Sequence, residues 1–480
     1  MTPALDIDKL EIRTQARHAH GAIVHRTSLQ LAPGARLTIL GESGSGKSIL
    51  AQAIMGTLPQ GVTATGSIAV WGQAVDRMAA PARQALWGRA LAMLPQEPWL
   101  ALNPTMRSLS QVAEVPHRVL GQPWPAAQDA ARAALGQLRL LEAAHKYPHQ
   151  MSGGMAQRVA FAATCASGAR LLIADEPTKG LDAALRDQIG DLLAAHLRAD
   201  HALITITHDV ALARRLGGTV AIMLDGRIIE QGPACEVLEH PRHAYSQALV
   251  QADPARWEPM SHTMPPSARA AVTATQLSKA FGAHRLFTGV DLTVSEGEVV
   301  AVPGPSGCGK TTLGHILLGL ERADSGQVHR PGAGRPWSFQ KLYQDPPAAF
   351  APRRSLRGSL ADLVRRHRLG MADAAELMRA LRLGDALLDR FPAQVSGGEL
   401  QRFALLRVLL LRPAFVFADE PGSRLDPITQ KLTMQLLNDN AAAHRFGVVL
   451  VTHDAAVARN GAHRVASIPF VGADGTGGAL

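Results

Sequence analysis

Two segments of the chain combine glycines with a lysine and a hydroxyl residue in the order GxxxxGK[ST]. The first runs from Gly41 to Ser48 and the second from Gly304 to Thr311. Each follows a short apolar run and precedes a helical pattern, which is the context that this motif requires. Glycines allow a tight turn whose backbone N–H groups point at phosphate oxygens, and a helix N-terminus reinforces that attraction. We therefore predict a nucleotide phosphate site at each segment.

The lysine and hydroxyl residues that end the two segments have separate predicted roles. Lys47 and Lys310 would reach the β- and γ-phosphates, and the hydroxyls of Ser48 and Thr311 would bind Mg²⁺. A glycine-rich loop by itself is more often a tight turn. Two complete copies in a chain with 8 lysines make a phosphate site the better interpretation.

An acidic pair ends an apolar, strand-like run in each half of the chain. Asp175 is followed by Glu176, and Asp419 by Glu420. Such a pair can be no more than a solvated strand edge. Downstream of a phosphate loop, the better interpretation is an aspartate that coordinates magnesium and a glutamate that polarises the attacking water.

A histidine ends the next strand-like run in each half. These residues are His208 and His453. A lone histidine is usually structural, but matching positions after two such runs make both histidines candidates for contact with a γ-phosphate.

The second half of the chain repeats the first. The phosphate-loop segment recurs at an offset of 263 residues, and the segments that begin at Gln150 and Leu171 recur at an offset of 244. Steady offsets indicate two copies of one domain rather than a short-period solenoid. We expect a first domain over residues 1–251, a proline-bearing linker over 252–270 and a second domain over 271–480.

Each copy alternates short apolar runs with helical patterns. The runs at 37–40, 171–174 and 202–207 are bounded by turn residues, as buried parallel strands are. The Ala-rich windows at 128–141 and 182–197 favour helices. This alternation predicts an α/β fold whose parallel sheet is covered on both faces.

Composition excludes several classes of protein. With 480 residues, 46% apolar and 19% charged, the chain has a globular balance and room for two or more domains. Three distant cysteines exclude a disulfide framework and argue against structural zinc. The net charge of +9 is carried by dispersed arginines, which favours solvated faces over a nucleic-acid surface. We expect neither a secretory signal nor a membrane span.

A Ser-Gly-Gly motif, followed closely by Gln-Arg, precedes each acidic strand. With it, six motifs recur in the same order twice, and the chain resembles two ATP-binding-cassette (ABC) ATPase domains fused in tandem. The resemblance covers nearly the whole chain. It implies two P-loop domains, each with a parallel-sheet core, a small antiparallel β region and a helical subdomain. It also implies that ATP and Mg²⁺ bind at two composite sites, each completed by the Ser-Gly-Gly motif of the opposite domain.

The resemblance assigns roles residue by residue. The implied catalytic residues are Glu176, Glu420, His208 and His453. The implied ATP-binding residues are Gly41, Glu42, Ser43, Gly44, Ser45, Gly46, Lys47, Ser48, Gly304, Pro305, Ser306, Gly307, Cys308, Gly309, Lys310, Thr311, Thr312, Phe281, Ser152, Gly153, Gly154, Ser396, Gly397 and Gly398. The implied magnesium residues are Ser48, Thr311, Gln96, Gln344, Asp175 and Asp419, and the implied interface aspartates are Asp182 and Asp426.

Several positions depart from the family pattern. Met155 and Glu399 stand where glutamine is commoner after Ser-Gly-Gly, and PGSRLD at 421–426 keeps the aspartate of the usual motif but not its other residues. The adenine-stacking aromatic is Phe281 in the second copy, whereas the ungapped equivalent in the first is His18, a weaker stacking surface. We expect both sites to hydrolyse ATP, with the first weaker for nucleotide.

Three classes of tandem ABC protein compete. Ribosome-associated members normally carry a long charged helical linker, and DNA-repair members carry zinc modules or coiled coils, whereas this linker is short and cysteines are few. A transporter motor is therefore favoured. The segments at 94–109, 342–356 and 240–249 resemble those of oligopeptide, dipeptide and nickel importers, a family that also includes metallophore uptake. Fused sugar-importer ATPases and soluble ribosome- or nucleic-acid-associated ATPases are the alternatives.

The importer resemblance implies partners and a location. It implies two transmembrane permease subunits on separate chains and, indirectly, an extracytoplasmic solute-binding protein, with no nucleic acid. It places the chain peripherally on the cytoplasmic face of a bacterial inner membrane. Because the ATPase does not touch the cargo, its chemistry does not distinguish peptide from nickel or from a metal–chelator complex. The segments at 174–182 and 396–407 resemble the nickel and metallophore branch slightly more.

Overall fold

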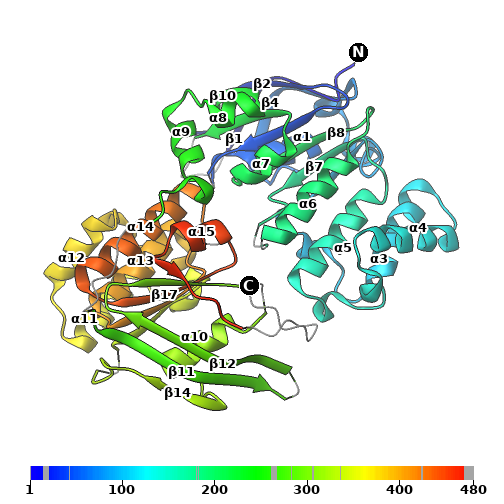
Figure 1. The fold of residues 1–480 in the computed structure, drawn as a ribbon. Helices are drawn as coiled ribbons and strands as arrows, with labels where there is room; N and C mark the ends of the chain where they lie inside the picture. Colours follow the sequence, from blue (N-terminus) through cyan, green and yellow to red (C-terminus); the bar gives the residue numbers. More distant parts are fainter. Residues whose placement is uncertain are drawn as a thin grey trace. The chain divides into compact units, whose positions relative to one another are not determined.

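The computed structural model divides into a first unit, Met1–Val250, and a second unit, Gln251–Leu480, and each is described by itself (Figure 1). The structure describes residues 2–14, 21–42, 44–179, 181, 183–260, 268–282, 284–304, 307–335, 337–422 and 425–469. Five residues discussed above lie outside this set, namely His18, Ser43, Asp182, Pro305 and Ser306.

The first unit contains an antiparallel sheet and a mainly parallel sheet. The antiparallel sheet has the order β2-β1-β4-β5 and consists of β1 (Leu5–Thr14), β2 (Gly21–Leu31), β4 (Val62–Val70) and β5 (Gln73–Ala74). The second sheet has the order β10-β9-β3-β8-β7-β6 and consists of β3 (Arg36–Leu40), β6 (Leu91–Leu94), β7 (Leu171–Asp175), β8 (Ala202–Thr207), β9 (Thr219–Leu224) and β10 (Arg227–Pro233). In it, β9 and β10 pair antiparallel, and the other neighbours pair parallel.

Helices of the first unit cover the parallel sheet and build a separate helical region. They are α1 (Lys47–Met55), α2 (Ala80–Gln84), α3 (Ser108–Leu120), α4 (Trp124–Gln137), α5 (Gly153–Cys165), α6 (Ala183–His196), α7 (Val210–Leu216), α8 (Ala234–Glu239) and α9 (Ala244–Gln251). Short 3₁₀ turns occupy 75–77, 98–101, 141–143 and 148–150. Helices α3 and α4 pack on each other and on α5, and together they form the predicted helical subdomain (Figure 1).

The second unit repeats this plan. Its antiparallel sheet, of order β12-β11-β14, consists of β11 (Ala270–Phe281), β12 (His284–Ser295) and β14 (Ser325–His329). Its parallel sheet, of order β15-β16-β17-β13-β18, consists of β13 (Val299–Pro303), β15 (Phe339–Leu342), β16 (Phe415–Asp419), β17 (Gly447–Thr452) and β18 (Arg464–Val465). The helices are α10 (Lys310–Leu318), α11 (Leu356–His367), α12 (Met371–Ala380), α13 (Gly397–Leu410), α14 (Pro427–His444) and α15 (Ala455–Asn460), with 3₁₀ turns at 346–349, 385–387 and 392–394.

Burial explains why these segments form strands. Every residue of β7, β8, β16 and β17 is buried, as the unbroken apolar runs predict for parallel strands covered on both faces. The parallel order brings the carboxyl ends of β3, β7 and β8 to one sheet edge, and those of β13, β16 and β17 to the equivalent edge. The predicted α/β fold with parallel-sheet cores is confirmed.

Part of the predicted linker packs into the second unit. A 3₁₀ turn spans Pro254–Arg256, and the Trp257 side chain is 8% exposed in the core that also contains Met434 and Val457. The indole N–H of Trp257 donates to the Ala252 carbonyl at 2.9 Å. The first part of this segment is therefore an ordered part of the second unit rather than a free connection.

Candidate nucleotide sites

The first phosphate loop, residues 41–48, turns from β3 into α1. Gly44 and Gly46 have φ values of +88° and +97°, a left-handed conformation that favours glycine. A Cβ on Gly41 would lie 2.2 Å from the Met223 carbonyl oxygen, and one on Gly46 would lie 2.9 Å from that of Ile23. The glycines are thus required both by backbone conformation and by close approach.

The second phosphate loop, residues 304–311, makes the same turn from β13 into α10. Gly307 and Gly309 have φ values of +81° and +110°. Cys308 is buried between them, and Thr312 lies in the first turn of α10. The two loops therefore have matching backbone geometry over their described residues.

The lysine of each loop is buried and turned inward. Lys47 is 5% exposed, and its Nζ donates to the carbonyls of Gly41 and Glu42, both at 2.7 Å. Lys310 is equally buried, and its Nζ donates to the Gly304 carbonyl at 2.7 Å. Both ammonium groups are therefore held by loop carbonyls that phosphate oxygens can replace as partners.

Asp175 ends β7 beside the first phosphate loop. Its side chain accepts a hydrogen bond from Ser48, and its residue is 3% exposed. The buried Oδ1 has no hydrogen-bond partner among the described residues. Burial raises the pKa of Asp175 to about 6, although Ser48 and Lys47 act in the opposite direction. An unsatisfied carboxylate oxygen beside a hydroxyl suits Mg²⁺, so these residues fit the predicted metal.

Asp419 ends β16 in a different environment. The Thr311 hydroxyl donates to its two oxygens at 3.1 and 3.3 Å, and the Lys341 Nζ lies 3.1 Å from Oδ2. Sequence reasoning missed Lys341. The signal is that Lys341 stands three residues before Gln344, where the first unit has Met93.

Glu176 and His208 form a buried pair in the first unit. His208 Nδ1 lies 2.9 Å from Glu176 Oε1, and the Thr207 hydroxyl donates to Oε2 at 3.3 Å. Glu176 has a φ of +49°, and its N–H donates to the Ile206 carbonyl at 2.7 Å. Burial opposes ionisation of both groups, but their mutual attraction outweighs it, lowering the pKa of Glu176 and raising the pKa of His208.

The second unit repeats this pair with Glu420 and His453. The His453 Nδ1 lies 3.1 Å from Glu420 Oε1, and Glu420 has a φ of +45°. Burial is again outweighed by the partner, so the pKa of Glu420 is lowered and the pKa of His453 is raised. The Gln344 amide also donates to Glu420 Oε2 at 2.8 Å, whereas Gln96 lies exposed after β6. The structure thus brings together the acidic residue and histidine that the sequence placed apart.

The Ser-Gly-Gly motifs form helix N-termini. Ser152 caps α5 by accepting from the Met155 N–H, and Ser396 caps α13 by accepting from the Glu399 N–H, both at 3.3 Å. The Ser396 hydroxyl also donates to Glu399 Oε2 at 2.8 Å. The glycines that follow the two serines are Gly153, Gly154, Gly397 and Gly398. Both serines are exposed, so each motif presents an accessible helix N-terminus suited to an anion.

Two further predicted residues lie at element ends. Asp426 caps α14 by accepting from the Thr429 N–H at 3.0 Å. Phe281 ends β11 with 54% of its surface exposed, and the Lys279 Nζ lies 5.0 Å from its ring centroid. The stacking of adenine on this ring stays a prediction.

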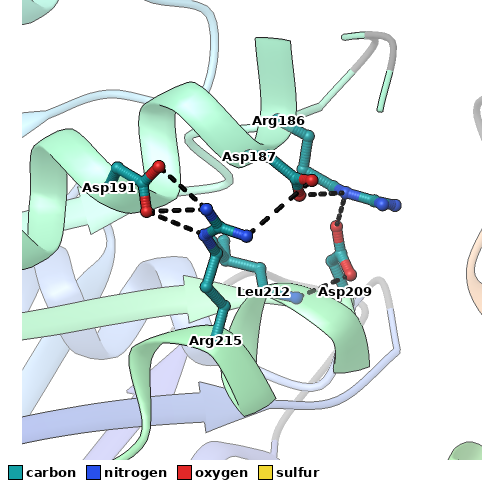
Figure 2. A network of polar contacts seen from close by, with 6 residues as sticks. All are labelled: Arg186, Asp187, Asp191, Asp209, Leu212 and Arg215. Carbon is teal, nitrogen blue, oxygen red and sulfur yellow. Dashed lines mark hydrogen bonds and ion pairs between the residues drawn. The ribbon is translucent and has the colours of Figure 1, made fainter. Parts of the chain in front are cut away.

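A polar network fixes α7 against α6 in the first unit (Figure 2). Asp209 caps α7 by accepting from the Leu212 N–H at 3.0 Å, and Arg186 on α6 lies 3.8 Å from its other oxygen. Arg215 on α7 donates to Asp191 on α6 at 2.7 to 2.9 Å. Because α7 begins directly after His208 and Asp209, this network supports the histidine of the Glu176 pair.

The Tyr245 hydroxyl from α9 was also missed in the sequence. It accepts a hydrogen bond from the Glu42 N–H of the first phosphate loop at 2.9 Å. The two residues lie 203 positions apart, so no local pattern predicts their contact.

Comparisons with known proteins match both units. A family model described as ABC transporter matches residues 24–179 and 287–423. The peptidoglycan transport ATP-binding protein YejF of Agrobacterium fabrum is 32% identical over 95% of this chain and 89% of its own length. The glutathione import ATP-binding protein GsiA of Salmonella typhi is 29% identical over 92% of this chain and 81% of its own length.

A solved structure shares the tandem fold. The archaeal ribosome recycling factor aABCE1, in complex with the ribosomal stalk protein aP1, superposes with a TM-score of 0.68 at 18% identity, over 95% of this chain and 86% of that chain. At this identity the likeness concerns the fold. The family model, in contrast, spans both phosphate loops and both acidic strands. The chain therefore belongs to the ABC transporter family and is an ATPase with two ATP-binding cassettes.

Proposed function

We propose that this chain is the ATP-hydrolysing subunit of an ABC importer for peptide-containing compounds, working through two permease subunits on separate chains. The observation that carries the proposal is that each unit holds a buried loop lysine, a strand-end aspartate and a glutamate–histidine pair. The relatives similar to nearly the whole chain include ATP-binding proteins for peptidoglycan transport and glutathione import, both cargoes with peptide bonds. Nickel and metallophore uptake are the narrower alternatives from the same importer family.

The glutamate–histidine pairs supply the base for hydrolysis. Lowered pKa values keep Glu176 and Glu420 ionised at neutral pH, so each carboxylate can accept a hydrogen bond from water. The water oxygen attacks the γ-phosphorus while the bond to the bridging oxygen breaks, which yields ADP and phosphate. His208 and His453 hold the carboxylates in place, and the raised pKa of each histidine favours its positively charged form next to the site.

The metal-binding residues differ between the two cassettes. Mg²⁺ bound with ATP would neutralise phosphate charge. In the first cassette Ser48 and Asp175 would hold it, with Gln96 in the neighbouring loop. In the second cassette Thr311 and Gln344 occupy the equivalent positions, but Asp419 already pairs with an ammonium.

The exposed Ser-Gly-Gly helices complete the proposed mechanism. Each would bind the γ-phosphate of the ATP held by the opposite cassette, so that two ATP molecules join the cassettes and hydrolysis lets them separate. Among the described residues no helix is long and apolar enough to cross a membrane. The similarity to importer ATP-binding proteins is what supports placing the chain on the cytoplasmic face of a bacterial inner membrane, bound to permeases and linked through them to a solute-binding protein.

Purification from native membranes tests the assignment. A tagged chain is isolated from detergent-solubilised membranes, and stoichiometric partners are identified by mass spectrometry. Two polytopic permeases are the expected result, and a copurifying binding protein then allows direct assay of peptide, nickel and chelator binding. Recovery of ribosomal proteins or nucleic acid with no membrane protein would overturn the transport assignment.

Single substitutions test whether both cassettes hydrolyse ATP. Glu176→Gln and Glu420→Gln should each reduce ATP turnover, and Glu236→Gln at an exposed position of α8 serves as the matched control. Turnover abolished by Glu420→Gln but unaffected by Glu176→Gln would contradict two active sites.

A further inference from the structure

The second cassette contains a largely buried lysine ammonium at the carboxylate that is predicted to bind metal. The Lys341 side chain is 11% exposed, and its Nζ lies 3.1 Å from Asp419 Oδ2. The same ammonium donates to His315 Nε2 at 3.1 Å. Two aromatic rings complete its surroundings, with the Nζ 5.1 Å from the centroid of Tyr343 and 5.8 Å from that of Phe417.

Strand register identifies the equivalent position in the first cassette. Lys341 on β15 pairs with Phe417 on β16, and Met93 on β6 pairs with Ile173 on β7. The 263-residue offset of the phosphate loops places Gln52 at the position of His315, and the strand register that aligns Lys341 with Met93 places Pro95 at the position of Tyr343. The first cassette thus lacks the lysine and also the histidine and two aromatic residues that surround it in the second cassette. The difference between the cassettes is therefore a whole local environment and not a single substitution.

We propose that the Lys341 ammonium acts as a built-in cation on Asp419, so that the second cassette binds ATP with less dependence on Mg²⁺ and binds divalent cations more weakly than the first. The inference rests on the proposed function, because it assumes that both cassettes bind ATP. Its physical basis is that a fixed positive charge occupies the carboxylate oxygen and repels a second cation at close range with little water to screen it.

The equivalent aspartate of the first cassette, Asp175, has different surroundings. There the Oδ1 of Asp175 is buried without a partner among the described residues, so a divalent cation meets an available negative charge. In the second cassette both oxygens of Asp419 have partners, the Thr311 hydroxyl and the Lys341 ammonium. The same two motif residues therefore present different charges to an incoming metal.

Manganese titration of the full-length chain tests the proposal. With a non-hydrolysable ATP analogue bound, free Mn²⁺ is followed by electron paramagnetic resonance. The wild type should show two classes of Mn²⁺ site whose dissociation constants differ by ~10-fold or more, as expected from the repulsion of one nearby fixed charge. Lys341→Met should move the weak class to the affinity of the tight class.

A reciprocal substitution keeps the test independent of how Lys341→Met folds. Met93→Lys should weaken Mn²⁺ binding at the first cassette, and Lys341→Arg, which keeps the charge, should retain the weak class. In EDTA, a fluorescent ATP analogue should bind at about one equivalent to the wild type and lose that equivalent in Lys341→Met.

Two results would overturn the inference about Lys341, and a third would refute the proposed function. Equal Mn²⁺ affinities at both cassettes of the wild type, or a weak class unchanged by Lys341→Met, would show that Lys341 is a structural ion pair. Failure of the analogue to bind at either cassette, with or without divalent cation, would instead refute the proposed function itself.

Discussion

Neutralising Asp175 should stabilise the nucleotide-free first unit. The carboxyl group is buried with one oxygen unpartnered, and burial raises its pKa from 3.8 to about 6. One pKa unit corresponds to about 1.4 kcal/mol, so ionisation of Asp175 at pH 7 costs the folded state about 3 kcal/mol. Asp175→Asn has nearly the same shape and no charge, and it should raise the free energy of unfolding by about 2 to 3 kcal/mol.

The pH dependence gives the sign of this effect. Because the folded pKa of Asp175 is raised above its unfolded value, the penalty is absent well below pH 3.8 and complete above about pH 6. The stability advantage of Asp175→Asn should therefore fall from about 3 kcal/mol at pH 7 to about half of that at pH 5.

The matched substitution in the second unit should act in the opposite direction. Asp419→Asn removes the partner of the Lys341 ammonium, and leaving a buried charge unpaired costs about 3 to 5 kcal/mol. The contrast separates a carboxylate that destabilises its unit from one that stabilises it, although both occupy the same motif position.

Differential scanning calorimetry in EDTA, without nucleotide, provides the assay. Because the chain has two units, the transitions must be resolved separately rather than as one free energy. About 3 kcal/mol should raise the transition of the first unit by roughly 6 °C or more in Asp175→Asn. A downward shift in Asp175→Asn, or shifts of the same direction in both variants, would refute the electrostatic reasoning.

Three further changes follow from particular contacts. Gly314→Ala should destabilise the second unit by about 1 to 3 kcal/mol, because its Cβ would lie 2.0 Å from Phe417 Cζ; added Phe417→Ile should recover most of the loss in calorimetry, and no recovery would contradict the steric explanation. Glu399→Gln should lower stability by less than about 1 kcal/mol in the same assay, since it weakens one exposed cap of α13, and a larger loss would mean that the cap matters more than its exposure indicates. Arg186→Gln should speed amide exchange in α7 while costing about 1 kcal/mol or less, because it removes one ion pair from Asp209; unchanged exchange would show that the network does not hold α7.

The sequence predicted those features that a short segment determines by itself. Each phosphate loop is one contiguous segment, and the positive φ values of its second and third glycines are a local requirement for glycine. The buried strands could be predicted because an unbroken apolar run of this length fits a parallel strand covered on both faces. The small antiparallel sheets were predicted from the family resemblance alone. Strands such as β1 contain register shifts and a positive φ at Lys9, which break the alternation of apolar and polar residues that would mark a strand.

Features that depend on distant contacts could not be predicted in this way. Trp257 lies in a proline-bearing stretch that reads as a linker, yet the core of the second unit buries it. Tyr245 lies in an ordinary amphipathic helix, and its role follows from the position of α9 next to the first phosphate loop. Lys341 is a charged residue within the short strand β15. Its polar partners, His315 and Asp419, come from helix α10 and the neighbouring strand β16, which lie far from it in the sequence.

The two cassettes show that identical motif residues do not fix the energetics of a site. Asp175 and Asp419 occupy the same place at a strand end, but the Oδ1 of Asp175 has no hydrogen-bond partner among the described residues, whereas the Lys341 ammonium lies 3.1 Å from Oδ2 of Asp419. A metal that binds at Asp175 would remove most of a penalty of about 3 kcal/mol, so metal and nucleotide binding should stabilise the first unit strongly. In the second unit the Lys341 ammonium already lies against the equivalent carboxylate, 3.1 Å from Oδ2 of Asp419. Cation binding should therefore be coupled to folding stability mainly in the first cassette, even though the sequence motifs of both cassettes are complete.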